Sequence, residues 1–147
     1  MLQFNQTEPS LKRVVIMGCN ALSISTATSL AEKGHAIHIM DVTSERFNEL
    51  PTDHVENGRI VPVIGDCTVQ QDQLRAAVPD SDVFLALSNE DTANALAAQM
   101  SKVLHEVQIV ICRMDNTTMV DIYNNLGIIA INTTSLISKK ILTTIGS

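Results

Sequence analysis

The sequence predicts an α/β fold: a doubly wound parallel sheet of about six strands, in the order 3-2-1-4-5-6, with helices on both faces. Short runs that are apolar at every position alternate with segments of helical periodicity. Such runs are typical of strands buried on both faces of a parallel sheet. With 147 residues, 45% of them hydrophobic and 18% charged, the chain is long enough for one domain with a substantial core.

Six apolar runs are the expected strands. The third run contains Pro62, which cannot donate a ladder hydrogen bond, so we expect this strand at an edge of the sheet. The expected strands span residues 13–17, 36–40, 60–64, 83–87, 107–112 and 128–131.

Segments with apolar residues at helical spacing lie between these runs. Gly34 ends the first of them. A short helix is expected to begin near Thr43 or Ser44 and to end before Pro51, and Thr68 is expected to cap the helix after the third strand. The last helix has an apolar stripe that could pack on this domain, on a second subunit or on a further domain. The stripe consists of Leu136, Ile137, Ile141, Leu142 and Ile145.

Composition excludes several classes of function. A formal net charge of -6 is unfavourable for a nucleic-acid surface, which needs clustered Lys and Arg. No apolar run approaches the length needed to span a bilayer, so no direct membrane insertion is expected. We expect residues 1–11 to form a flexible segment without a signal peptide, and residues 12–147 to form one nucleotide-binding domain.

Three cysteines fall at expected strand ends, but neither a metal site nor a disulfide framework follows from them. They are not closely spaced, no histidine is near them in the sequence, and cysteine is a common small core residue. An odd number of cysteines is compatible with a reducing cytosol. The histidines form no pattern with a nucleophile or an acid, and there is no P-loop lysine, so we expect no catalytic residues. The three cysteines are Cys19, Cys67 and Cys112.

The segment Gly18-Cys19-Asn20-Ala21-Leu22-Ser23 takes the place of the GxGxxG phosphate loop of Rossmann-type nucleotide sites. Only the first glycine is present. Asn20 can adopt a left-handed backbone at the turn, although its side chain would crowd a pyrophosphate. The N–H groups that begin the next helix can still hold an anion. The alternative is a turn that binds no ligand.

The second expected strand ends at Asp41, which is followed by Val42. Asp41 comes about 20 residues after the loop glycine, where an acidic residue binds a ribose diol in Rossmann-type domains. A carboxylate disfavours a 2′-phosphate, so NAD or an adenosine nucleotide fits better than NADP. A solvated loop aspartate or a helix cap is the alternative.

The remaining strand ends complete the candidate site. Asp66 and Cys67 follow the third strand and would border an adenine pocket. Ser88 begins a polar segment after the fourth strand, which would face Gly18 across the cleft, unless it is only a helix N-terminus. Arg113, after the fifth strand, could pair with a phosphate or with an acidic neighbour.

Several blocks, taken together and in order, resemble the N-terminal domain of Trk-type potassium-uptake regulators, also called the regulator-of-potassium-conductance domain. The resemblance extends over residues 12–137. The blocks are RVVIMG, SLAEKGHAIHIMD, VIGDCT, DVFLALSNEDTAN and ICRMDNTTMVDIYNNLGI.

The resemblance implies a cytosolic regulatory module that binds AMP, ADP, ATP or NAD(H), dimerises, and gates a potassium channel or transporter. It places the nucleotide contacts at the Gly18 loop, Asp41, Asp66 with Cys67, and Ser88. Two departures favour AMP-like ligands or none: the loop has lost its later glycines, and Ala21 stands where many relatives have a basic residue. Because the sequence ends soon after Ile145, we expect it to lack the C-terminal ligand-sensing domain that relatives often append.

The leading hypothesis is therefore a nucleotide-sensing regulatory subunit rather than an enzyme. It would be cytoplasmic and peripheral to a membrane potassium transporter. It would form a homodimer or higher oligomer through the sheet edge and the C-terminal helix. The alternatives are a degenerate Rossmann-type interaction module without a ligand and a small NAD-dependent oxidoreductase.

Overall fold

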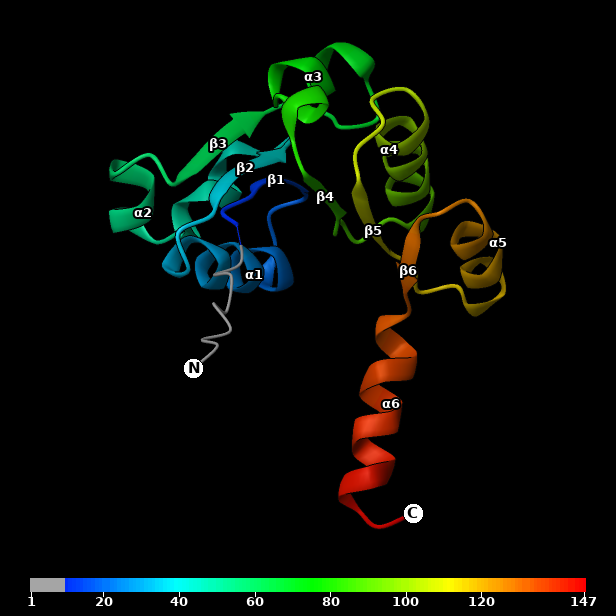
Figure 1. Ribbon diagram of the computed structural model, residues 1–147. Coiled ribbons are helices and arrows are strands. Elements are labelled where there is room, and N and C mark those ends of the chain that lie inside the picture. The colour runs from blue at the N-terminus through cyan, green and yellow to red at the C-terminus, as the bar shows by residue number, and fades with distance from the viewer. Residues whose placement is uncertain (1–9) are drawn as a thin grey trace, which may run out of the picture.

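The computed structural model describes residues 10–147, which form a six-stranded parallel sheet in the order β3-β2-β1-β4-β5-β6 (Figure 1). The expected fold class and strand order are confirmed. Residues 1–9 of the expected flexible segment lie outside the described residues. The strands are β1 (Arg13–Met17), β2 (Ala36–Asp41), β3 (Ile60–Ile64), β4 (Val83–Ala86), β5 (Ile109–Arg113) and β6 (Ile129–Ile131).

Helical segments lie between all consecutive strands, as crossovers between parallel strands require. The α-helices are α1 (Ala21–Glu32), α2 (Thr52–Glu56), α3 (Gln70–Arg75), α4 (Asp91–Val103), α5 (Val120–Asn125) and α6 (Thr133–Thr144). The 3₁₀ helices are η1 (Ser44–Glu49), η2 (Val78–Asp80) and η3 (Thr117–Met119). The short helix expected after β2 is the 3₁₀ helix η1, whereas α2 was not expected.

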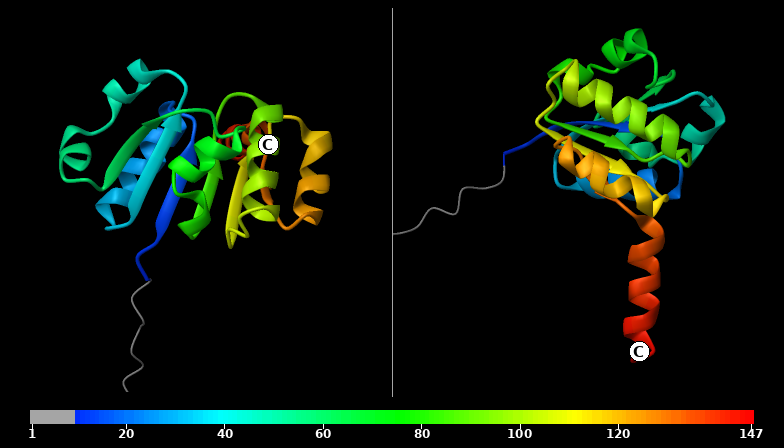
Figure 2. Two further views of the ribbon diagram at one scale, coloured as in Figure 1. Left: turned by 90° about the horizontal axis from the view of Figure 1, so that it is seen from above. Right: turned by 90° about the vertical axis from the view of Figure 1, so that its right-hand side faces the viewer.

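The two faces of the sheet are covered unequally (Figures 1 and 2). Alternate residues of β1 point to opposite faces: Val14 and Ile16 pack with α1, whereas Val15 and Met17 pack in the cluster that contains α4. The face with α3, α4 and α5 is covered along most of the sheet. On the other face, α1, η1 and α2 lie over β1, β2 and β3. The β4 residues Val83 and Leu85 are still buried in the cluster on this face, whereas Ile109 and Ile111 of β5 are only partly buried.

The half of this second face that lies over β4, β5 and β6 forms an open apolar groove of about 560 Å³. Leu22 and Leu30 of α1 form one wall, and Leu136 at the start of α6 lies at the other end. Beyond Leu136, α6 projects away from the domain, and none of its residues is buried (Figure 1).

Pro62 lies in the middle of β3, and the expected edge position is confirmed. Ile37 donates its N–H to the Arg59 carbonyl, and Gly65 donates to the Asp41 carbonyl. Because backbone groups of alternate residues point to opposite sides of a strand, the odd-numbered residues here bond to β2. Pro62 therefore has its missing N–H on the outward side, where no ladder bond is lost.

Gly18 lies where the loop after β1 meets the end of β4. Its φ is +92°, and a Cβ built on it would lie 2.9 Å from Ser88 Cα and 3.0 Å from Ser88 N. The atoms in the way are backbone atoms, which cannot turn aside as a side chain can. Glycine is thus required here both by conformation and by space.

We expect Gly18→Ala to lower the free energy of unfolding by at least about 3 kcal/mol, because it combines left-handed strain with overpacking against backbone. Gly58→Ala is the matched control: Gly58 has φ +81° and nothing within 4 Å of its built Cβ. That variant should lose only the strain, about 1–2 kcal/mol. Urea denaturation measures both, and equal losses would contradict the close-approach argument.

Candidate functional site

A cavity of about 360 Å³ opens at the carboxyl ends of β1, β2, β3 and β4. This is the switch point at which doubly wound sheets bind ligands. Six of the residues expected in the site line it: Gly18, Asp41, Val42, Asp66, Cys67 and Ser88. The rest of the expected set, which does not line it, comprises Cys19, Asn20, Ala21, Leu22 and Arg113.

Asp41 is the buried acid of this cavity. Its Oδ2 accepts the Cys19 N–H at 2.8 Å, and its Oδ1 accepts the Thr43 N–H at 2.8 Å. These bonds tie the loop after β1 to the end of β2. A carboxylate has about four acceptor positions, so lone pairs remain for the hydroxyl groups of a ligand.

Asn20 is the N-cap of α1 and forms a capping box with Ser23. The expectation of a left-handed backbone at Asn20 is wrong: its φ is -140°, which is extended. Its Oδ1 accepts the Ser23 N–H at 3.1 Å, and its Nδ2 donates to the Leu87 carbonyl at 2.8 Å. Asparagine suits this position because its amide both caps α1 and donates to the end of β4, and not because of its backbone conformation in the turn.

This capping leaves few donors for an anion at the start of α1. The N–H groups of Cys19, Asn20 and Ser23 are bonded to Asp41, Ser23 and Asn20 respectively. Among the described residues, the N–H groups of Ala21 and Leu22 have no acceptor, because they precede the first helical hydrogen bonds. These two N–H groups are the helix donors available to a phosphate.

The turn after β3 is built by aspartates. Asp66 accepts both the N–H and the hydroxyl of Thr68, while Asp72 accepts the Asp66 N–H at 2.9 Å. This bond, together with Arg75, holds the pKa of the Asp72 carboxyl below its usual value. The expectation that Thr68 caps the next helix is wrong: α3 begins at Gln70, and the Thr68 hydroxyl is used within the turn.

Ser88 is held by Asn94, which is fully buried. Asn94 Oδ1 accepts from the Ser88 N–H and hydroxyl at 3.0 and 2.7 Å, and Asn94 Nδ2 donates to the carbonyls of Ser88 and Arg113. Asn94 thus joins the ends of β4 and β5. It supports the cavity wall from behind rather than lining it.

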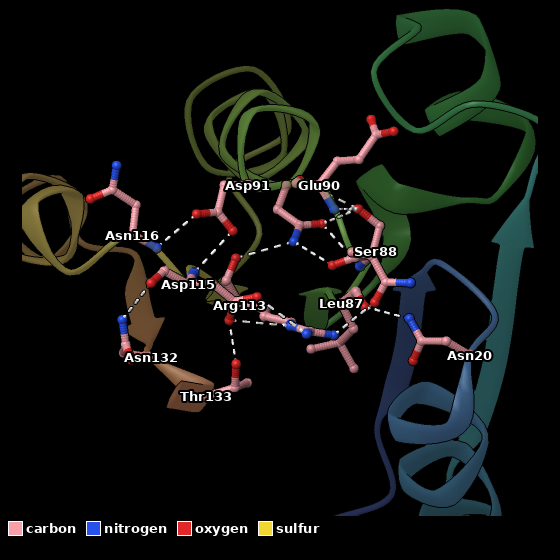
Figure 3. Close-up of polar contacts among 12 residues, drawn as sticks. Asn20, Leu87, Ser88, Glu90, Asp91, Arg113, Asp115, Asn116, Asn132 and Thr133 are labelled. Atoms are coloured by element: carbon pink, nitrogen blue, oxygen red, sulfur yellow. Dashed lines mark hydrogen bonds and ion pairs between the residues drawn. The ribbon is translucent and has the colours of Figure 1, made fainter. Parts of the chain in front are cut away.

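Arg113 lies outside the cavity and pairs with an acidic neighbour (Figure 3). Its Nη2 is 3.2 Å from Asp115 Oδ2, and its Nη1 donates to Asn89 Oδ1 at 3.0 Å. Of the two roles left open by the sequence, the ion pair is the one present. Asn89 lines the cavity, so Arg113 touches the wall of the cavity indirectly.

Arg46 is a cavity residue that the sequence analysis missed. It is the basic side chain among the lining residues, about half exposed, with Nη1 3.8 Å from Asp41 Oδ2. Its carbonyl accepts from the Cys19 thiol at 3.3 Å, which fixes η1 against the loop. The sequence feature that could have revealed it is a basic residue in the helix expected just after Asp41. Arg46 reaches the cavity because this segment folds as the tight 3₁₀ helix η1.

The three cysteines are buried and unpaired. Burial, aided by nearby carboxylates, raises the pKa of Cys19 to about 11 and those of Cys67 and Cys112 to about 12. The thiols are therefore protonated core groups at neutral pH. Within residues 10–147, His, Cys, Asp and Glu form no cluster that could hold a metal ion. Every helix of that range is too short or too polar to cross a bilayer.

A family model described as the TrkA-N domain matches residues 14–134. The Trk system potassium uptake protein TrkA of Streptomyces coelicolor is 31% identical over 116 residues, which is 78% of this chain and 50% of that protein. A TrkA homolog of Pyrococcus abyssi is 31% identical over 101 residues, 69% of this chain and 43% of that protein. The chain thus spans about half the length of these relatives.

Solved structures show the same fold. The TrkA-N domain of the inner membrane protein ybaL from Escherichia coli superposes with a TM-score of 0.78 at 10% identity, covering 92% of this chain and 97% of that one. The AMP-bound Kef C-terminal domain of Shewanella denitrificans gives 0.70 at 14% identity, covering 92% and 82%. The GsuK channel bound to NAD gives 0.64 at 14%, covering 86% and 23%, and GsuK has also been solved with ADP.

We expect all three thiols to resist Ellman's reagent near pH 8 in the native protein, reacting at least about 100-fold more slowly than after unfolding. Stability should follow the same chemistry. The thiols leave the free energy of unfolding unaffected below their ordinary pKa of 9.0 and lower it above that pH, because unfolded thiols ionise while native thiols stay protonated. Rapid reaction of the native protein would contradict this burial.

Proposed function

Since the chain belongs to the TrkA-N domain family, we propose that it is the nucleotide-sensing domain of a potassium uptake system, acting at the cytoplasmic side of a membrane transporter. Its curated relatives are named as potassium uptake proteins, a description that gives no support to the oxidoreductase alternative. The observation that carries the proposal is the buried Asp41 carboxylate at the switch-point cavity, with acceptor positions still open.

The cavity offers complementary groups for an adenosine nucleotide. Asp41 would accept hydrogen bonds from the ribose diol. Asp66 and Cys67 would border the adenine, and Gly18 would lie beside the phosphate. The free N–H groups of Ala21 and Leu22 begin α1 next to this wall without lining the cavity. The solved structures named for AMP, ADP and NAD share this fold and make a nucleotide the natural candidate.

The charge of the lining favours a ligand with few negative charges. Asp41, Asp66 and Glu90 face the cavity together with a single guanidinium, that of Arg46. Repulsion between these carboxylates and the phosphates of a ligand grows with each added phosphate. We therefore propose that AMP and NAD bind more tightly than ADP, and ADP more tightly than ATP.

We also propose that two copies of the chain form a dimer by exchanging α6. The face of α6 that carries Ile137, Ile141 and Ile145, spaced four residues apart, is exposed. The apolar groove is open, and the floor residues Ile109, Ile111 and Ile131 are only partly buried. The groove exposes almost only apolar atoms and lies beside the β6 edge of the sheet. Exposed apolar surfaces of this kind mark interaction sites.

A second copy is the occupant that the local geometry favours. Asn132 caps α6 directly after β6, with its Oδ1 accepting the Ser135 N–H and its Nδ2 donating to the Asp115 carbonyl. These bonds direct α6 away from the groove of its own chain. Exchange between two copies covers both helices and both grooves by one symmetric contact, as closed dimers do.

The interaction module without a ligand remains the second candidate because of one observation. The chain itself already uses the donors of the loop, at Cys19, Asn20 and Ser23, that a complete phosphate loop leaves for a ligand. In that case the cavity would be a remnant, and the groove with α6 would be the whole functional surface.

The nucleotide proposal is tested by thermal unfolding with AMP, ADP, ATP, NAD and NADH. A ligand at 100 times its dissociation constant stabilises by about 2.7 kcal/mol. Asp41→Asn should raise the dissociation constant of the tightest ligand about 10- to 100-fold, since bonds to a charged acceptor are worth about 1.5–3 kcal/mol. Asp121→Asn, on the exposed side of α5, is the control and should change nothing. If no nucleotide shifts the transition, the sensor fails and the interaction module is favoured.

The dimer proposal is tested by sedimentation equilibrium. Ile141→Lys places a charge in the middle of the exposed stripe and should raise the dimer dissociation constant at least about 100-fold, because the loss of apolar burial occurs at both symmetric sites. Thr143→Lys carries the same charge on the opposite face of α6 and should leave the dimer intact. A wild-type protein that is monomeric at all concentrations would overturn the proposal.

A further inference from the structure

A continuous set of hydrogen bonds joins the wall of the nucleotide cavity to the first turn of α6 (Figure 3). It passes through four elements: the end of β4, the start of α4, the end of β5 and the start of α6. Asp115 and Arg113, which follow or end β5, lie at its centre. Neither lines the cavity, and the proposed binding of a nucleotide gives neither of them a role.

Asp115 is held from both sides. Its N–H donates to Asp91 Oδ1 at 2.9 Å, on the side of α4, and its carbonyl accepts Asn132 Nδ2 at 3.1 Å. Its carboxylate accepts the hydroxyl of Thr133, the first residue of α6, and pairs with Arg113. The Thr133 hydroxyl and then Arg113 hold the pKa of the Asp115 carboxyl below its usual value, so it is ionised at neutral pH.

Arg113 connects this carboxylate to the cavity. One guanidinium nitrogen bonds to Asp115, and another donates to Asn89 Oδ1, which belongs to the cavity wall. The same side chain lines the apolar groove together with Thr133 and Leu136. One cation is thus bonded to the cavity wall and to the carboxylate that accepts the Thr133 hydroxyl, and it lines the groove that we propose the partner's α6 occupies.

The backbone around these residues is tied to the cavity as well. The Asp91 carboxylate accepts the N–H groups of both Asp115 and Asn116, at 2.9 and 2.8 Å. Asp91 directly follows Glu90, which lines the cavity. A ligand that displaces residues 88–90 must therefore either carry residues 113–116 with it or break charge-assisted bonds.

The direction of α6 depends on this cluster, because no residue of α6 is buried. The ties between α6 and the rest of the domain are those of its first turn, at Asn132, Thr133 and Leu136. A helix of this length is about 18 Å long. A rotation of about 20° at its base would move its far end by about 6 Å.

We propose that Asp115 and Arg113 are positioning residues that set the direction of α6 according to the occupancy of the nucleotide cavity. The dependence on a ligand rests on the proposed function. The positioning of α6 by Asp115 and Thr133 does not require a ligand. The two parts together would let a nucleotide bias the dimer through a differential contact, which a switch requires.

The test measures distances by electron paramagnetic resonance between spin labels at Ser25→Cys on α1 and Thr144→Cys at the end of α6. Both positions are exposed, whereas the native thiols are buried. Labelled chains are diluted with unlabelled wild type so that only distances within one chain are recorded. AMP and NAD are the ligands used.

Without a ligand, Asp115→Asn and Thr133→Val should each broaden the distance distribution at least about twofold, and Thr133→Ser, which keeps the hydroxyl, should restore it. With a ligand, the wild type should show a shifted distribution. Asp115→Asn should lose that shift while its nucleotide dissociation constant stays within about twofold of the wild type, because Asp115 does not touch the cavity. Asp121→Asn is again the control.

The outcomes separate this inference from the proposed function. Unchanged distributions in both ligand-free variants overturn the positioning role, whatever binds. A wild type that binds a nucleotide without any shift overturns the coupling but leaves the nucleotide site intact. A wild type that binds no nucleotide refutes the sensor, and the ligand-free variants then still decide whether Asp115 positions α6.

Discussion

The close contact between Gly18 and the backbone of Ser88 is the constraint on which the rest of this structure depends. It brings the ends of β1 and β4 together at the point where the connections on either side of β1 diverge. The same loop is bonded to β2, because Gly18 donates to the Met40 carbonyl and Cys19 donates to Asp41. Three strand ends are thereby held at one place, and the cavity lies between them.

The strands could be read from the sequence because each is a local pattern. A buried parallel strand is apolar on both faces, so residues such as Val14, Val15 and Ile16 identify it without knowledge of any partner. Pro62 predicted its own edge position for a similar reason, since a missing donor is a local property. The expected strands extend slightly too far: β4 ends before Leu87, and β5 begins after Val107. The exact ends depend on ladder bonds to the neighbouring strand, which the sequence of one strand does not determine.

The site was harder to predict because its side chains form hydrogen bonds with residues that are close in space but that the sequence does not identify. Asn20 was expected to serve the turn, but its amide reaches the distant Leu87 carbonyl. Thr68 was expected to cap a helix, but Asp66 accepts its hydroxyl within the turn. Arg46 needed the curvature of η1 to reach Asp41. In each case the side chain had two chemically reasonable partners, and only the three-dimensional structure shows which of the two it contacts.

The position of Pro62 has a consequence for how the protein behaves at high concentration. The outward donors of β3 belong to residues 60, 62 and 64, and proline removes the middle one. A strand from another molecule that tried to extend the sheet there would meet a gap in its ladder and the proline ring itself. That edge is thus protected against fibril-like aggregation, although Val61 and Ile64 are exposed beside it. The apolar groove lies beside β6, at the opposite end of the sheet, so the protection of the β3 edge leaves the proposed dimer contact unaffected.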